Sequence, residues 1–145
     1  MLTPEFLFNI ANPIATVGWA LLVLAPRWRV TRAVVLSGAL PLLLAALYVV
    51  VIGYQTWAHP APGAGFSTLG EVAALFRQPW ALLAGWVHYL CFDMAVGAWE
   101  ARDAQRRGVP HWALVPCLLA TFLLGPLGLL LYSGVRQWFR PAPAA

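Results

Sequence analysis

Four long apolar runs dominate the hydrophobic pattern of the chain, at residues 6–25, 33–54, 79–101 and 112–135. A helix needs about 20 mostly apolar residues to cross the hydrocarbon core of a membrane, and each run is long enough to do so. The pattern therefore predicts an all-α protein. We expect an integral membrane four-helix bundle, formed by a single transmembrane domain over residues 1–145.

The connector between the second and third runs contains a short amphipathic segment. Thr68 and Glu71 have the spacing of a capping box, in which each side chain binds a backbone N–H near the other residue. Apolar residues then recur at i, i+3, i+4 and i+7, namely Leu69, Val72, Ala73 and Phe76. Because this segment is too short to span a membrane, it predicts an interfacial helix that lies flat on the membrane surface.

The composition excludes an ordinary soluble domain. Of the 145 residues, 61% are hydrophobic and 10% are charged, whereas soluble domains carry about 25% charged residues. The net charge of +4 comes from nine arginines, and the chain has no lysine. Most of these arginines flank the apolar runs, where they act as topology signals. We therefore expect the lipid bilayer as a partner, and no nucleic acid.

The placement of the arginines predicts an orientation in the membrane. The first connector holds Arg27, Arg29 and Arg32, and the third holds Arg102, Arg106 and Arg107. The remaining arginines are Arg77, Arg136 and Arg140. Because arginine-rich loops stay in the cytoplasm, the first and third connectors are expected there, with both termini on the periplasmic side. No signal or transit peptide is apparent at the start, which favours the inner membrane of a bacterium.

The third apolar run carries ionisable residues at membrane depth. With a rise of about 1.5 Å per residue, His88 lies near the midplane and Asp93 lies about 21 Å from the start of the run. Such groups are costly in hydrocarbon, so each is a candidate functional residue. Asn9 and Asn12 share one stripe of the first run. We expect these four residues in one polar core, together with Thr121. For Asp93 the alternative is a buried hydrogen bond that holds helices together.

Eight tryptophans are many for a chain of this length. Most of them fall near the predicted membrane boundaries, as expected for an aromatic belt. Trp19 and Trp86 fall deeper, and core packing is the simplest interpretation of both. The alternative is a ligand site in which Trp19, Trp86, Tyr89 and Thr121 contact the substrate.

A metal site at the cytoplasmic end of the third run is a further hypothesis. Glu100 and Asp103, at i and i+3, can hold one cation together, with His111 as a third ligand. Asp93 cannot join them, because it lies about 10.5 Å from Glu100 along the helix axis. The alternative is that Glu100 and Asp103 pair with Arg102, Arg106 or Arg107, and that His111 merely begins the fourth helix.

The fourth run contains Gly125, Pro126 and Gly128. Proline lacks a backbone donor, so a kink is expected there. Small residues also let helices approach closely. Ordinary helix packing is therefore the favoured interpretation, and a widened cavity for an elongated apolar ligand is the alternative.

Several stretches resemble a known family. They are Ala84-Gly85-Trp86-Val87-His88-Tyr89-Leu90 with Phe92-Asp93, then Trp99-Glu100-Ala101-Arg102-Asp103-Ala104, Pro110-His111, Pro116-Cys117 and Phe122-Leu123-Leu124-Gly125-Pro126-Leu127-Gly128. Together with Asn9 and Pro13 they are similar to the ABA4-like family, whose plant members are required to make the carotenoid neoxanthin. The resemblance covers residues 75–132.

The resemblance implies carotenoid or isoprenoid chemistry. The plant members are associated with converting violaxanthin to neoxanthin, which opens an epoxide to an allene without net redox change. This isomerisation needs an acid for the epoxide oxygen and a base for a proton of the polyene. A dry site favours the uncharged form of both groups, so Asp93 is the expected acid and His88 the expected base, with Asn9 and Asn12 beside them. A carotenoid isomerase is the enzyme that this predicts.

Three other functions remain open. A non-catalytic subunit would hold a carotenoid or a quinone for a partner enzyme. An isoprenyl phosphate enzyme would need a divalent metal, held by Glu100, Asp103 and His111 at the cytoplasmic face. A transporter built from four helices would need to form a homo-oligomer.

Overall fold

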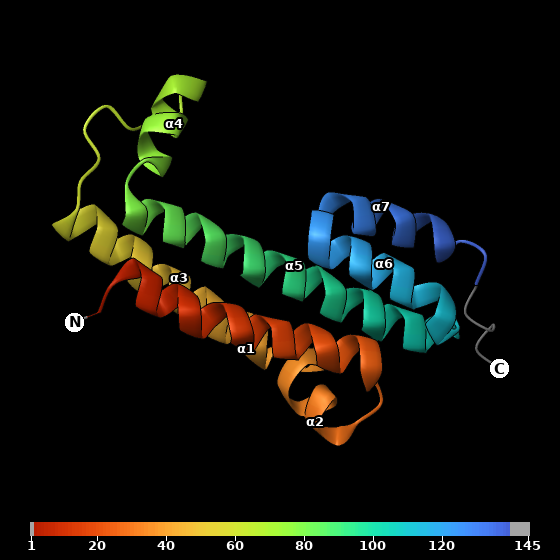
Figure 1. The fold of residues 1–145 in the computed structure, drawn as a ribbon. Coiled ribbons are helices and arrows are strands. Elements are labelled where there is room, and N and C mark those ends of the chain that lie inside the picture. Colours follow the sequence, from red (N-terminus) through yellow and green to blue (C-terminus); the bar gives the residue numbers. More distant parts are fainter. Residues whose placement is uncertain (1, 140–145) are drawn as a thin grey trace.

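The computed structural model describes residues 2–139, and all regular structure in that range is helical, as predicted (Figure 1). The elements are α1 (Pro4–Leu24), α2 (Arg29–Thr31), the π-helical turn η1 (Arg32–Leu36), α3 (Ala39–Ala58), α4 (Leu69–Phe76), α5 (Pro79–Arg107), α6 (His111–Leu124) and α7 (Pro126–Val135).

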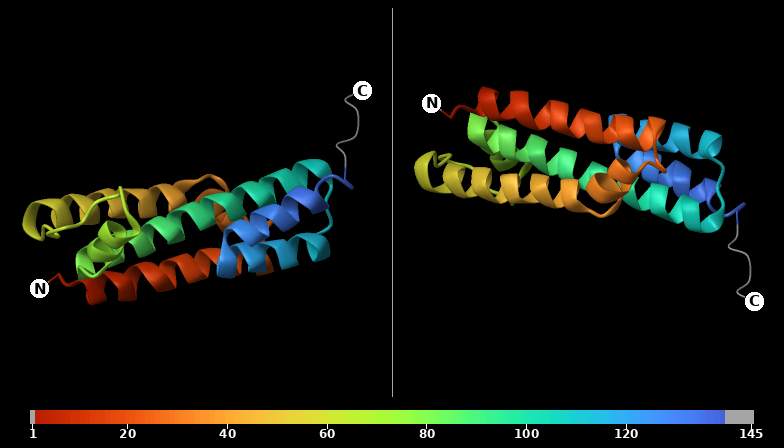
Figure 2. Two further views of the ribbon diagram at one scale, coloured as in Figure 1. Left: turned by 90° about the horizontal axis from the view of Figure 1, so that it is seen from above. Right: turned by 90° about the horizontal axis from the view of Figure 1, so that it is seen from below.

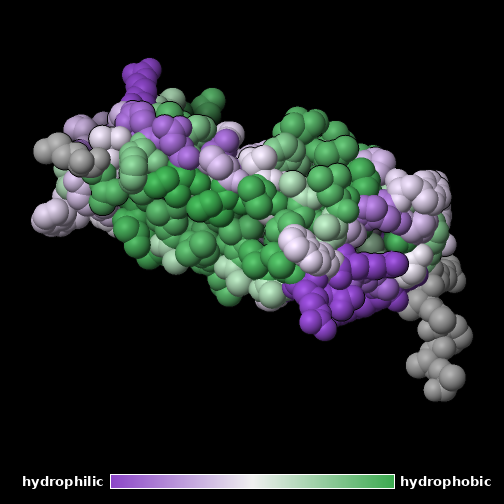
Figure 3. All heavy atoms as spheres, turned by 60° about the horizontal axis from the view of Figure 1, so that its bottom comes forward, coloured by the Kyte–Doolittle hydropathy of each residue, from purple (hydrophilic) through white to green (hydrophobic). Residues whose placement is uncertain are grey.

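Three long helical segments form the body of the protein. These are α1, α3 with the two turns before it, and α5, and each is long and apolar enough to cross a membrane. α5 lies at the centre, where it contacts α1, α3, α4, α6 and α7 (Figure 2). Its residues Ala84, Val87 and Met94 are buried in the core. Large apolar side chains cover the outside between the two ends of the molecule (Figure 3). Such a broad apolar surface is typical of proteins that contact a membrane or another protein.

α4 is the short helix predicted in the connector before α5. Thr68 caps it as expected, because its hydroxyl oxygen accepts a hydrogen bond from the N–H of Glu71 at 3.2 Å. Glu71 in turn accepts from the N–H of Ser67 at 3.0 Å, one residue away from the expected donor. No residue of α4 is buried, and the Phe76 ring packs directly on Gly85. α4 therefore rests on the first half of α5 without joining the core.

The prediction of one transmembrane helix over residues 112–135 is wrong. The chain forms two short helices there, α6 and α7, which pack against each other as a hairpin (Figure 1). Helices of 14 and 10 residues reach about 21 and 15 Å. Neither helix can cross a hydrocarbon core of about 30 Å. The predicted four-helix bundle is therefore corrected to three long helices and one hairpin of about half their length.

The reversal between α6 and α7 occurs at Gly125 and Pro126. Pro126 has no N–H to offer the carbonyl of Phe122, and it disfavours helical backbone at the residue before it. Gly125 has φ 41° and ψ −87°, a conformation that favours glycine. Gly128 then allows α7 to pack directly on the backbone of Thr121. The expected kink is thus a complete turn, and the expected close approach of small residues occurs within the hairpin.

The hairpin also changes where the C-terminal part lies. α7 returns to the end of the molecule at which α6 begins, and α1 starts at the opposite end (Figure 2). The prediction that both termini lie on the periplasmic side required a fourth crossing, and the hairpin does not provide one. Arg136 follows α7 at the end that also holds α2 and the last turns of α5. Arg140 lies outside the described residues.

Candidate functional site

A row of polar side chains on α5 faces the hairpin. It consists of Tyr89, Asp93, Glu100 and Asp103, whose spacings of four, seven and three residues place them on one side of the helix. Each of them meets a group of α6, α7 or the turn between them. We call this row the α5 seam. The first part of α5, before Tyr89, extends beyond the hairpin (Figure 1).

The turn between α6 and α7 covers the end of the α5 seam that lies nearest the start of α5. The Tyr89 hydroxyl donates a hydrogen bond to the carbonyl oxygen of Phe122 at 2.9 Å. The Asp93 carboxyl lies against Gly125, where a Cβ atom on the glycine would be 2.8 Å from Asp93 Oδ1. Asp93 Oδ2 is buried and has no hydrogen-bond partner among residues 2–139. Asp93 thus lies where the uncovered part of α5 meets the hairpin, with one oxygen unpaired.

Glu100 is fully enclosed in the middle of the α5 seam, with 0% of the residue exposed. Its Oε1 atom accepts a hydrogen bond from the Thr121 hydroxyl at 2.9 Å. Its Oε2 atom is buried and, within the described part of the chain, has no partner. A buried carboxyl with an unpaired oxygen is costly. Packing alone therefore does not explain Glu100 or Asp93.

The last residue of the α5 seam, Asp103, lies in an ion-pair cluster. It accepts hydrogen bonds from the Tyr132 hydroxyl at 2.8 Å and from two nitrogens of Arg136 at 3.0 Å each. Arg107 adds a third donor at 3.2 Å, and the Arg136 guanidinium lies 5.1 Å from the centre of the Trp99 ring. The Asp103 carboxylate therefore has its hydrogen-bond donors within the cluster. One of them, Arg107, was expected from the sequence.

The three residues predicted as metal ligands do not converge. Glu100 and Asp103 bind the donors described above, and His111 Nε2 lies 2.7 Å from the carbonyl oxygen of Val23. Within residues 2–139, no group of three His, Cys, Asp or Glu side chains is arranged to hold a metal ion. In this structure the three side chains make contacts between helices.

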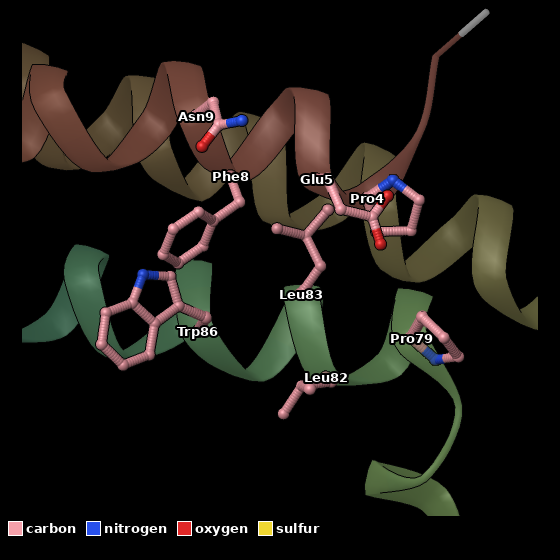
Figure 4. A pocket seen from close by; sticks show the side chains of 8 residues that line it. All are labelled: Pro4, Glu5, Phe8, Asn9, Pro79, Leu82, Leu83 and Trp86. Carbon is pink, nitrogen blue, oxygen red and sulfur yellow. The ribbon is translucent and has the colours of Figure 1, made fainter.

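A cleft of about 450 Å³ opens between the first halves of α1 and α5 (Figure 4). Its walls are mostly apolar, from Phe8, Leu82 and Leu83, with Glu5 and Asn9 as polar lining residues. Trp86 also lines it and contacts Phe8, with ring centres 5.8 Å apart. The cleft therefore suits an apolar group that carries a polar end.

Trp86 connects this cleft to the α5 seam. Its indole N–H donates to the side-chain oxygen of Asn12 at 3.2 Å, which fixes the ring against α1. On its other side the ring centre lies 5.3 Å from that of Tyr89, the first residue of the seam. Phe8, Trp86 and Tyr89 thus form a continuous aromatic row that leads from the cleft to Asp93.

His88 lies in different surroundings. Its ring centre is 5.6 Å from that of Tyr48 on α3 and 4.6 Å from that of Phe92. It lines a separate pocket beside α3 and α4. The expected polar core is therefore distributed over three places. Asn9 lines the cleft and Asn12 binds Trp86 beside it, Asp93 lies in the α5 seam with Thr121 against Glu100, and His88 lines this pocket.

Trp19 packs in the core, which was the simpler of the two interpretations drawn from the sequence. It is 4% exposed, its ring packs on Gly97 of α5, and it contacts Phe122 with ring centres 5.4 Å apart. Trp86, at 39% exposed, remains accessible to a ligand.

The donors supplied by α7 were missed from the sequence. Tyr132 and Arg136 reach Asp103 because α7 turns back, whereas a straight helix would carry both residues away from it. The regular spacing of Tyr89, Asp93, Glu100 and Asp103 was the available signal for the seam.

The fold and the site define a class of protein: an all-helical chain with three helices long enough to span a membrane and an acidic row on the central helix that is closed by a hairpin. The family model described as ABA DEFICIENT 4-like, or ABA4-like, matches residues 6–132. The chain belongs to the ABA4-like family, which confirms the resemblance. No curated protein and no solved structure matches the chain.

Proposed function

We propose that this chain is an integral protein of a bacterial inner membrane that binds a carotenoid or a related isoprenoid and isomerises it by proton transfer within the bilayer. One observation carries the proposal. An apolar cleft and an aromatic row lead along the uncovered part of α5 to Asp93, whose buried oxygen has no partner among residues 2–139.

The arginines support one orientation. Arg27, Arg29, Arg32, Arg102, Arg106, Arg107 and Arg136 gather at the end of the molecule where the hairpin begins and ends, whereas Arg77 lies near the other end. Since arginine-rich ends remain in the cytoplasm, we assign the start of α1 to the periplasm and the end of α7 to the cytoplasm. The hairpin then enters the membrane from the cytoplasmic side and returns, and its packing against α5 shields the backbone of the turn from lipid.

The shape and polarity of the row suit an elongated ligand with a polar group at each end. Asp93 lies about 21 Å along α5 from Pro79, which is a length that a polyene can bridge. Trp86 and Tyr89 would stack on the apolar middle of the ligand. Glu5 and Asn9 are the polar groups at the outer end, and Asp93 is the polar group at the inner end.

We assign proton transfer to Asp93. In the isomerisation that the family implies, an epoxide C–O bond breaks as its oxygen gains a proton, and the neighbouring polyene carbon loses a proton as the allene forms. No oxidant or reductant is required. The Asp93 carboxyl donates the first proton, and the carboxylate that results accepts the second. The Tyr89 hydroxyl donates to the carbonyl oxygen of Phe122, so it holds in place the turn against which Asp93 lies. His88, the base expected from the sequence, faces α3, so we assign it no role in this step.

Co-expression with carotenoid-producing genes tests the proposal, with chromatographic analysis of the pigments. The native chain is expected to purify with bound pigment and to yield a product of unchanged mass. Asp93→Asn is expected to keep the pigment and lose the product. Trp86→Leu is expected to lower the amount of bound pigment. Glu71→Gln on α4, outside the cleft and the α5 seam, serves as the control. Its amide oxygen can still accept from the N–H of Ser67, so the variant is expected to behave as the native chain.

Three outcomes contradict the proposal. Normal product from Asp93→Asn would exclude Asp93 as the proton donor. If His88→Ala bound pigment but formed no product, His88 rather than Asp93 would be the base that accepts the polyene proton. Bound pigment without any product from the native chain would favour a non-catalytic carotenoid-binding subunit.

A further inference from the structure

A second pocket lies between α3, α4 and α5, separate from the cleft of the proposed reaction. It is an open pocket with a volume of about 300 Å³, which is at the lower end of the range for small-molecule sites. Phe66 and Phe76 line it from the connector and α4, while Tyr48 lines it from α3 and His88 from α5. The Phe76 ring packs directly on Gly85, so this glycine allows α4 to close one side of the pocket.

Two hydrogen-bonding groups line this pocket at membrane depth. His88 is nine residues into α5, or about 14 Å from its start. The His88 and Tyr48 rings are in contact, with centres 5.6 Å apart. Within residues 2–139 no hydrogen bond uses the Tyr48 hydroxyl or the imidazole nitrogens. Tyr48 is partly exposed and His88 is exposed, so both groups are open to a ligand that approaches from the lipid. Unpaired polar groups are costly in hydrocarbon, so an acceptor brought by a ligand would be favourable here.

The remaining lining residues restrict the class of ligand. No Arg, Asp or Glu lines the pocket, so a phosphate or another charged head group would have no counter-charge. The aromatic walls favour a flat ring. Tyr48 offers an O–H donor, and the imidazole offers at least one N–H donor in either protonation state. A flat, uncharged ring with carbonyl acceptors meets all of these conditions.

From this geometry we infer that the pocket between α3, α4 and α5 binds the head group of a membrane quinone, with Tyr48 and His88 as donors to its carbonyl oxygens. This site is distinct from the cleft that leads to Asp93. It involves binding alone and requires no chemical step.

Titration calorimetry of the full chain in lipid nanodiscs tests this inference, with a ubiquinone analogue that has a ten-carbon tail as the probe. Saturable binding of about one probe per chain is expected. Removing one donor, in His88→Leu or Tyr48→Phe, should weaken the affinity about tenfold, the effect of one lost hydrogen bond. Tyr54→Phe is the matched control on the same helix and is expected to bind as the native chain. A monodisperse elution profile for each variant establishes that it is folded.

The inference is overturned if the native chain shows no saturable binding, or if the double variant of Tyr48 and His88 binds as tightly as the native chain. It is also overturned if a hydroxylated carotenoid end-ring analogue without paired carbonyls displaces the quinone with equal potency. The direct titration contains no carotenoid, and the displacement uses only an end-ring analogue, so neither outcome depends on the pigment assay that tests Asp93.

Discussion

The Tyr89 hydroxyl on α5 donates a hydrogen bond to the carbonyl oxygen of Phe122 on α6 at 2.9 Å. In an uninterrupted helix this carbonyl would accept from the N–H of residue 126, which is a proline. Tyr89 therefore supplies the donor that Pro126 lacks. The bond fixes the hairpin turn at the level of Asp93, so it determines where the uncovered part of α5 ends.

Replacing Tyr89 with phenylalanine should loosen the hairpin. The Phe122 carbonyl would lose its donor at membrane depth, and we expect the free energy of unfolding to fall by about 0.6–1 kcal/mol. Reversible unfolding in detergent, titrated with a denaturing detergent, measures this change. Tyr48→Phe removes the same hydroxyl from α3, where it donates no hydrogen bond within residues 2–139, and should leave the stability unchanged. Equal stability of the two variants would show that the bond contributes nothing.

Gly128 should tolerate alanine far less well than Gly134, although both lie in α7. A Cβ atom at Gly128 would collide with the backbone of Thr121, whereas one at Gly134 would meet nothing within 4 Å. Since a packed backbone cannot move aside cheaply, Gly128→Ala should cost about 1–3 kcal/mol of unfolding free energy. Gly134→Ala should be neutral or stabilising, because alanine favours helix.

The same unfolding titration compares these two variants. Gly128→Ala should also separate Thr121 from Glu100 and expose the buried carboxyl to water. If both alanine variants unfold at the same point, the close contact between α6 and α7 is not present.

The three long helices and α4 were predictable because local sequence determines them. Apolar length is sufficient for α1, α3 and α5. The helix predicted over residues 33–54 is interrupted, however, because Gly38 has φ 89° and α3 begins only at Ala39. The Thr68 cap and the periodicity that follows it are sufficient for α4. These elements need no knowledge of what they pack against.

The hairpin was not predictable on the same basis. A Gly-Pro pair is compatible with a kink or with a reversal, and contacts distant in sequence decide between them. Tyr89 satisfies the Phe122 carbonyl, and Gly128 allows α7 to lie on α6. Neither contact can be recognised until α5 and the hairpin are placed side by side.

The rotation of α5 about its own axis decides which of its residues form the site. Trp19 packed on Gly97 and Phe76 packed on Gly85 set that rotation. It directs Asp93 toward the hairpin and leaves His88 beside Tyr48. Depth along the helix was predictable for both residues, but the direction in which each one faces was not.

Neutralising Asp103 should release α7 from α5. Asp103→Asn removes the charge that holds Arg136 and Arg107, and hydrogen bonds to charged groups are worth about 1.5–3 kcal/mol each. Trypsin cleavage after Arg136 reports the release, and its rate should rise at least about tenfold. Glu5→Gln removes an exposed carboxylate from α1 and should leave the rate unchanged. Unchanged cleavage of Asp103→Asn would mean that the ion pairs do not hold α7 in place.

The end of α7 should lie in the cytoplasm, on the side opposite to the start of α1. A fluorescent protein fused to the C-terminus of the full chain should fluoresce in a bacterial host, and alkaline phosphatase fused at the same place should be inactive. Cysteine placed at Ala61, in the connector before α4, should react with a membrane-impermeant maleimide from outside the cell. Cys91 and Cys117 are buried, so they contribute little background.

If the chain instead crossed the membrane a fourth time, only the results of the two C-terminal fusions would be reversed. Residues 111–135 would then carry the C-terminus to the periplasm, where alkaline phosphatase is active and the fluorescent protein is dark, while Ala61→Cys would still be labelled. The two reporters therefore separate the hairpin from a straight helix without depending on any functional assignment. Replacing Gly125 and Pro126 with leucine removes both features that end α6. If these residues cause the reversal, this variant should shift the reporters toward the periplasmic pattern.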